Sequence, residues 1–161
     1  MAHKPFWGEL EHVSPYCLAY NTMKYKARLW NVPLGGDWLE ACQGTLQEIH
    51  GRTIEKPERC ENRGQNEGFW GYWRVDFDEP ECITKWGTTW DKGCVRPGVH
   101  VVEAPMWGQK PNDDWYQMCW TTPGHLPGMS GDLGFPNDCQ QRGKRGGGMV
   151  GVWEFHDGNC Y

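Results

Sequence analysis

The chain has 161 residues and a formal net charge of −5, and 38% of its residues are hydrophobic. This length fits one ordinary domain or two very small ones, and no run of about 18 apolar residues is present that could insert into a membrane. Lys and Arg form no stripe with interleaved aromatic residues along the sequence, which argues against nucleic acid as a partner. Because aliphatic residues are few, we expect the 11 Trp and 8 Cys to build the core.

The same pattern occurs twice along the chain. DWLEAC at 37–42 matches DWYQMC at 114–119, and the same shift of 77 positions takes Cys17 to Cys94 and Trp30 to Trp107. The remaining matches need only small insertions: FWG (6–8) with KWG (85–87), KPERC (56–60) with FPNDC (135–139), and GFWGYW (68–73) with GMVGVW (148–153). The chain is therefore one unit of about 77 residues used twice.

The first copy is predicted to begin with a strand around 24–32, where β-favouring and basic residues alternate. A helix follows from about 38 to 49 and ends at His50-Gly51, and a short strand lies within 51–57. The segment 68–77 is the strongest strand candidate, and its alternation places Trp70, Tyr72, Arg74 and Asp76 on one face.

The second copy repeats this order. We predict a strand near 99–107, a helix over 115–121, a long Gly- and Pro-rich loop over 123–138 and a strand over 149–156. The expected fold class is α+β, with two tandem strand-helix-strand-strand repeats, pseudo-twofold symmetry and mainly antiparallel pairing. The first repeat spans 1–82 and the second spans 83–161, and we expect them to pack as one compact unit.

An acidic residue begins each predicted helix. Asp37 and Asp114 are followed three places later by Glu40 and Gln117, which is an Asp-based form of the capping box. A catalytic or metal-binding role for the two Asp is the alternative. We favour the N-cap, because an acid also suits the positive end of a helix dipole.

The eight Cys predict disulfides in an oxidising compartment. No C-x-x-C or clustered Cys/His spacing is present, so we expect no metal site and no cofactor. The favoured pairing repeats within each copy, although other pairings are open: Cys42–Cys60, Cys119–Cys139, Cys17–Cys82 and Cys94–Cys160. The first ten residues lack the apolar segment of a signal peptide, so we expect a secreted protein whose leader is already absent from this sequence.

Candidate catalytic groups lack a recognisable arrangement. Six His are present, but neither G-x-S-x-G nor H-E-x-x-H occurs. Ser130 lies among glycines without a strand-to-helix context. The acidic run DFDEPE (76–81) could supply a carboxylate pair for glycoside cleavage or a weak calcium site, but a solvated turn is the simpler interpretation. We therefore expect no catalytic residue.

The aromatic residues are the better indication of function. Trp30, Trp38 and Trp73 have counterparts at Trp107, Trp115 and Trp153, and residues kept in both copies are most simply core. Aromatic residues present in one copy are candidates for an exposed surface on which a sugar ring could stack, with polar groups in nearby loops binding the hydroxyls. Together these give the predicted ligand-binding residues Trp70, Tyr72, Trp90, Asp113, Tyr116, Trp120 and Arg142. A satellite core or a protein interface is the alternative for such residues.

Three motifs in each copy carry a resemblance to a known class: W-x7-W-x3-C, the following P-x-x-C, and the G-x-x-G-x-W strand. With them the chain resembles the cysteine-rich small secreted proteins of filamentous, mushroom-type fungi. The resemblance implies secretion and a binding function, and it supplies no catalytic residue. We predict a secreted, disulfide-stabilised, non-catalytic binding protein whose partner is a glycan. The alternatives are an accessory subunit or effector that binds another secreted or host protein, and a small hydrolase.

Overall fold

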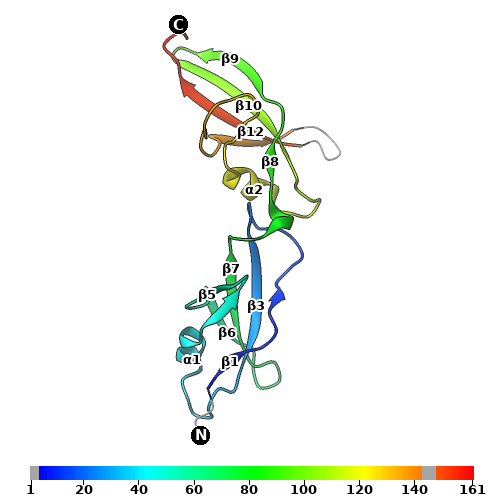
Figure 1. Ribbon diagram of the computed structural model, residues 1–161, viewed down its shortest axis with the longest axis vertical. Coiled ribbons are helices and arrows are strands. Elements are labelled where there is room, and N and C mark those ends of the chain that lie inside the picture. Colours follow the sequence, from blue (N-terminus) through cyan, green and yellow to red (C-terminus); the bar gives the residue numbers. More distant parts are fainter. Residues whose placement is uncertain (1–3, 143–147) are drawn as a thin grey trace. The chain divides into compact units, whose positions relative to one another are not determined.

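The computed structural model describes residues 4–142 and 148–161 and is mostly β, with two short helices (Figure 1). Contacts divide the chain into two compact units. Unit 1 comprises Met1–Pro15 and Met23–Asp78, and unit 2 comprises Tyr16–Thr22 and Glu79–Tyr161. The short segment 16–22 of the first repeat therefore belongs with the second unit. How the two repeats pack stays a prediction.

Unit 1 is a five-stranded antiparallel sheet in the order β1-β3-β7-β6, with β2 also pairing with β3. Its sheet strands are β1 (Phe6–Trp7), β2 (Glu11–His12), β3 (Met23–Trp30), β6 (Arg59–Asn62) and β7 (Phe69–Val75). Between β3 and β6 lie helix α1 (Trp38–Gly44) and a separate hairpin of β4 (Gln47–Ile49) and β5 (Arg52–Ile54). The alternation of buried and partly exposed residues along β3 gives the sheet one core face and one outer face.

Unit 2 has a sheet of similar composition in the order β11-β12-β10-β8, with β9 also pairing with β10. Its elements are the 3-10 turn η1 (Pro80–Cys82), β8 (Lys85–Trp86), β9 (Trp90–Arg96), β10 (Val99–Trp107), α2 (Trp115–Thr121), β11 (Asp138–Gln141) and β12 (Met149–His156). In β9 the register shifts between Gly93 and Asp91, so Lys92 is the extra residue of a bulge, and the φ of 70° at Gly93 suits this bend of the strand.

Predictions for the second copy are confirmed for the helix over 115–121 and the strands over 99–107 and 149–156. The helix predicted over 38–49 is too long, because it ends at Gly44. His50 and Gly51 both have positive φ (51° and 78°), so they form the two-residue turn of the β4–β5 hairpin and not a helix end. The helical share is consequently smaller than the predicted α+β class implies.

The helix caps are as predicted. The Asp37 side chain accepts hydrogen bonds from the backbone N–H groups of Leu39 and Glu40, both at 3.1 Å, and Asp114 accepts one from Gln117 at 3.0 Å. Each Asp therefore fills an N-cap role, which satisfies donors that have no partner within the helix.

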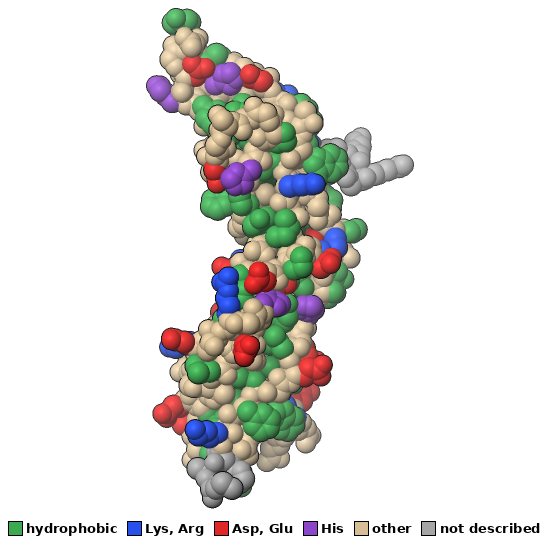
Figure 2. Space-filling model, in the orientation of Figure 1, with side chains coloured by type: hydrophobic (Ala, Val, Ile, Leu, Met, Phe, Trp, Pro, Cys, Tyr) green, Lys and Arg blue, Asp and Glu red, His purple; other side chains and the backbone are tan. Residues whose placement is uncertain are grey.

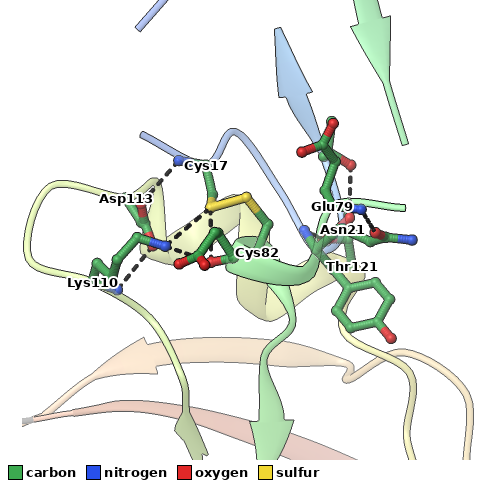
Figure 3. Close-up of a disulfide and its surroundings, with 10 residues drawn as sticks. Cys17, Asn21, Glu79, Cys82, Lys110, Asp113 and Thr121 are labelled. Carbon is green, nitrogen blue, oxygen red and sulfur yellow. Dashed lines mark hydrogen bonds and ion pairs between the residues drawn. A yellow bond between two sulfur atoms is a disulfide. The ribbon is translucent and has the colours of Figure 1, made fainter. Parts of the chain in front are cut away.

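The structure contains the four disulfides in the favoured pairing. Cys42–Cys60 joins α1 to β6 and Cys119–Cys139 joins α2 to β11, whereas Cys17–Cys82 and Cys94–Cys160 close long loops. Figure 3 shows Cys17–Cys82, which holds the segment 16–22 against η1 inside unit 2.

A pair of Trp side chains packs edge to face in each core. Trp7 and Trp73 have ring centroids 4.6 Å apart in unit 1, and Trp86 and Trp153 are 4.7 Å apart in unit 2. The glycine of the G-x-x-G-x-W strand makes room for this pair: a Cβ at Gly151 would lie 2.6 Å from the Trp86 ring and 2.8 Å from the Trp153 ring. The repeated W-G and G-x-W motifs thus encode one packing arrangement used twice.

Candidate functional site

The outer face of the unit 2 sheet carries a cleft of about 490 Å³, here called the unit 2 cleft. Its lining residues are Trp90, Pro105, Met106, Trp107, Gln109, Arg142, Gly148 and Val150. Trp90 pairs across the strands with Glu103, and Trp107 lies four residues further along β10. At about 3.3 Å per residue, the rows that hold the two indoles are roughly 13 Å apart.

Both indoles of the cleft are exposed to solvent. Trp90 is 44% exposed and Trp107 is 57% exposed. Trp107 lies against the backbone of Gly87, because a Cβ added at that glycine would be 2.0 Å from the indole Nε1. In unit 1, Trp30 lies against Gly8 in the same way and is 43% exposed. The interpretation of Trp30 and Trp107 as core is therefore wrong, whereas Trp73 and Trp153 are buried as expected.

The polar side of the unit 2 cleft is held in place by an ion pair. The Arg142 guanidinium donates two hydrogen bonds to the Glu103 carboxylate, both at 2.6 Å, and also donates to Gln140 Oε1. These bonds from Arg142 lower the pKa of the buried Glu103 carboxyl, against the opposing effect of burial. The pair is ionised but neutral in sum, so the cleft has no strong net charge.

Unit 1 has a pocket at the corresponding end of its sheet, here called the unit 1 pocket, of about 380 Å³. It is lined by Arg28, Leu29, Trp30, Asn31, Val32, Asn62, Gly64, Gln65, Gly68 and Phe69. Arg28 occupies the position of Pro105 in the second copy, and its guanidinium carbon lies 3.9 Å from the centre of the Trp30 ring. This position of the sheet is thus occupied by a cationic side chain in unit 1 and by an apolar side chain in unit 2.

Cations also cover the two predicted aromatic residues of unit 1. Trp70 is half-buried, with Arg63 4.7 Å and Lys26 5.5 Å from its ring centre. Tyr72 is buried beneath Arg59 at 3.9 Å. Hydrogen bonds from Arg63 and Arg59 lower the pKa of Glu61 to about 2. Strand alternation therefore does interleave cations with aromatic residues on this face, contrary to the interpretation of the linear sequence. The absence of a nucleic-acid partner stays a prediction.

The other predicted ligand-binding residues lie away from the two sites. Asp113 is buried, and its carboxylate accepts hydrogen bonds from the backbone N–H groups of Cys17 (2.9 Å) and Lys110 (2.8 Å), which is a structural role (Figure 3). Tyr116 and Trp120 are exposed on α2, which the Cys119–Cys139 disulfide ties to the core-face side of the sheet. Of the seven residues, the structure brings together Trp90 with Arg142 in the unit 2 cleft and Trp70 with Tyr72 on the unit 1 sheet. Asp113 and Tyr116 also line one pocket, of about 350 Å³, which is separate from the cleft.

A further cavity of about 430 Å³ in unit 2 contains a His between two carboxylates. The His100 ring nitrogens lie 3.1 Å from Asp157 Oδ2 and 2.5 Å from Asp91 Oδ1. Figure 2 shows histidine and acidic side chains together on the surface of the unit that holds the C-terminus. With both nitrogens bonded to acids, His100 has no nitrogen left to activate a hydroxyl nucleophile.

The group of possible metal ligands at this cavity lacks a free third ligand. Ligand atoms of His100, Asp157 and Cys160 lie within 4.8 Å of one another, and this is the one such group among residues 4–142 and 148–161. The Cys160 sulfur is bonded to Cys94, so it cannot act as a thiolate ligand.

The pairing of His100 with two carboxylates is expected to make the stability of the protein depend on pH. Hydrogen bonds to Asp91 and then Asp157 raise the pKa of His100. The stabilisation of the fold by protonated His100 and its two carboxylates is therefore complete below the ordinary His pKa of about 6.5. It is lost as the pH rises through the pKa that His100 has in the folded protein. We expect His100→Gln to lower the melting temperature more at pH 5.5 than at pH 8.5. An NMR titration of His100 with a midpoint at or below the ordinary value would contradict this.

Comparison with protein-family models, curated proteins and solved structures finds no match to this chain. Within the part of the chain that the structure describes, no helix has the length and apolar character needed to cross a membrane. Function is therefore inferred from the geometry of the sites.

Proposed function

We propose that this protein is a secreted, disulfide-stabilised glycan-binding protein without catalytic activity, and that the unit 2 cleft binds a neutral oligosaccharide. The observation that carries the proposal is the presence of two solvent-exposed indoles, Trp90 and Trp107, in one cleft. Exposed apolar rings cost free energy in water, and a ligand that covers them recovers it.

The shape and chemistry of the cleft suit a sugar chain. Indole faces stack on the C–H faces of sugar rings by the same dispersion and electrostatic contacts that pair aromatic rings. The roughly 13 Å between the rows of the two indoles suits a ligand longer than one ring. Arg142, fixed by Glu103 and Gln140, keeps one Nη1 hydrogen that is not donated to these residues, and it can donate this hydrogen to a sugar hydroxyl without a rearrangement of the side chain, which reduces the entropy cost of binding.

The proposal includes an origin by duplication and a place among the cysteine-rich small secreted proteins of filamentous fungi. It is supported by the matched motifs, by two antiparallel sheets with the same strand arrangement, and by four disulfides, which are typical of an oxidising compartment. Pseudo-twofold symmetry between the repeats is part of the same proposal.

The test is binding to an array of neutral cello-, xylo- and chito-oligosaccharides, followed by calorimetry on the best ligand. We expect Trp90→Ala and Trp107→Ala each to weaken binding about tenfold, because each removes one stacking platform worth roughly 0.5–1.5 kcal/mol beyond its area. Trp120→Ala is the matched control, since Trp120 is 39% exposed but lies outside the cleft. It should leave the affinity within about twofold.

Two outcomes would overturn the proposal. One is the absence of binding to any neutral glycan on the array by the unmodified protein. The other is a loss of affinity in Trp120→Ala equal to that in Trp107→Ala. Recovery of a stable protein complex that Trp107→Ala disrupts, together with a blank array, would establish the accessory-subunit alternative instead.

A further inference from the structure

The outer face of the unit 1 sheet is unusually rich in cations for an acidic protein. Among the paired strands and Arg63, six cations share this face with two carboxylates, Glu11 and Glu61. The cations are Lys24, Lys26, Arg28, Arg59, Arg63 and Arg74. In the second copy the strand residues Lys24, Lys26 and Arg28 correspond to Val101, Glu103 and Pro105. The sheet does not need these charges in order to form.

Several of these cations have no acidic partner. Arg59 and Arg63 pair with Glu61, but Arg28, Lys24 and Arg74 pair with no carboxylate within residues 4–142 and 148–161. Lys24 and Arg74 lie directly opposite each other on β3 and β7. Like charges at opposed positions destabilise a sheet, so this placement is unfavourable unless an anion lies over it.

The guanidinium group of Arg28 is held in one orientation at the unit 1 pocket. It stacks on Trp30, and a Cβ at Gly68 would lie 2.4 Å from its Nε, so the group fits closely between the indole and the glycine backbone. Its Nε is buried without a hydrogen-bond partner in the described part of the chain. Asn62 lines the same pocket, and its Oδ1 already accepts from Gly64 N at 2.9 Å, which leaves the Nδ2 hydrogens available for an acceptor.

From these contacts we infer that unit 1 binds an acidic polysaccharide, with a uronate carboxylate at Arg28 and further carboxylates along Lys26, Lys24 and Arg74. A fixed guanidinium matches a carboxylate with two parallel hydrogen bonds. The Trp30 and Trp70 rings carry cations on their faces and are not bare platforms for nucleobases. The disulfides are typical of an oxidising, extracellular setting, which favours an acidic glycan over a nucleic acid. The inference concerns another unit and another ligand than the unit 2 cleft, so either can fail alone.

The experiment measures binding of the full chain to an oligogalacturonate, to the same oligomer as its methyl ester, and to a single-stranded RNA of similar charge. We expect binding to the acid form that weakens as salt rises from about 0.05 to 0.5 M, and none to the ester. Arg28→Lys, which keeps the charge but loses the fork, should weaken binding at least tenfold.

A second variant separates binding from folding. Lys24→Gln with Arg74→Gln removes two opposed like charges, so its melting temperature should be unchanged or higher while its affinity for the oligogalacturonate falls at least tenfold. Arg52→Gln is the control, because Arg52 also lies over an aromatic ring, 4.3 Å from the centre of Phe77, but on β5 outside this face. It should bind like the unmodified protein.

Three results would overturn the inference. They are equal binding of the ester and the acid, tighter binding of RNA than of the oligogalacturonate, and unchanged affinity in the Lys24/Arg74 double variant. None of them involves the unit 2 cleft, and loss of neutral-glycan binding in Trp107→Ala would leave this inference intact.

Discussion

Replacing Cys94 and Cys160 together by Ala is expected to lower the free energy of unfolding of unit 2 by about 4 kcal/mol. The two residues are 66 positions apart, and the entropy that a cross-link removes from the unfolded chain grows with the length of the closed loop. Urea denaturation followed by tryptophan fluorescence measures the change.

A shorter loop supplies the matched comparison. Cys42 and Cys60 are 18 positions apart, so their replacement by Ala should cost about 3 kcal/mol. A loss below 1 kcal/mol for the Cys94/Cys160 variant would contradict the account, because it would mean that the core of unit 2 holds without this covalent tie.

Trp153→Ala is expected to cost about 3–5 kcal/mol of stability. The indole is 1% exposed, packs edge to face on Trp86, and donates a hydrogen bond to the Gly134 carbonyl at 3.1 Å. Its removal leaves a cavity that the surrounding side chains cannot fill, and it also leaves a backbone acceptor without its donor.

The control for this variant is Trp107→Ala. Because Trp107 is 57% exposed, its loss should change the free energy of unfolding by less than about 1 kcal/mol. The two Trp differ in burial but not in residue type. Equal destabilisation by both substitutions in chemical denaturation would show that the assignment of one to the core and the other to the surface is wrong.

The duplicated sequence predicted much of the packing. Residues that match between the copies favoured the disulfide pairs that the structure contains, and they predicted the helix caps and the buried Trp73 and Trp153, because these depend on contacts within one repeat. The segment 16–22 was assigned with the rest of the first copy. Besides the Cys17–Cys82 disulfide, its contacts with the rest of unit 2 include hydrogen bonds to Asp113 and Thr121, which lie some 100 residues away, and a contact at that distance leaves no local pattern.

The helix predicted over 38–49 is too long because the dipeptide His50-Gly51 is compatible with two structures, a helix end and a hairpin turn. Gly after a helical pattern is a common C-cap, and His50-Gly51 suited that interpretation, but two consecutive residues with positive φ also make the tightest hairpin turn. The choice depends on whether β4 and β5 pair, which the local sequence does not specify.

Two physical features explain why the sequence pattern did not predict the positions of Trp30, Trp107 and Arg28 at the candidate sites. The presence of Trp30 and Trp107 in both copies predicts core residues, yet each lies on a glycine backbone at the end of the sheet with its ring exposed. Arg28 is part of no contiguous stripe of Lys and Arg in the linear sequence. Alternation along 24–30 brings every second residue to one face, and applying that rule would have found the cationic surface.

The most direct test of the central claim is a titration of the indole N–H signals by two-dimensional NMR, with the neutral oligosaccharide selected on the array. The account predicts that the signals of Trp90 and Trp107 shift with a common affinity while those of the buried Trp86 and Trp153 do not. Shifts confined to Trp120, or no shift of any indole at saturating ligand, would contradict it.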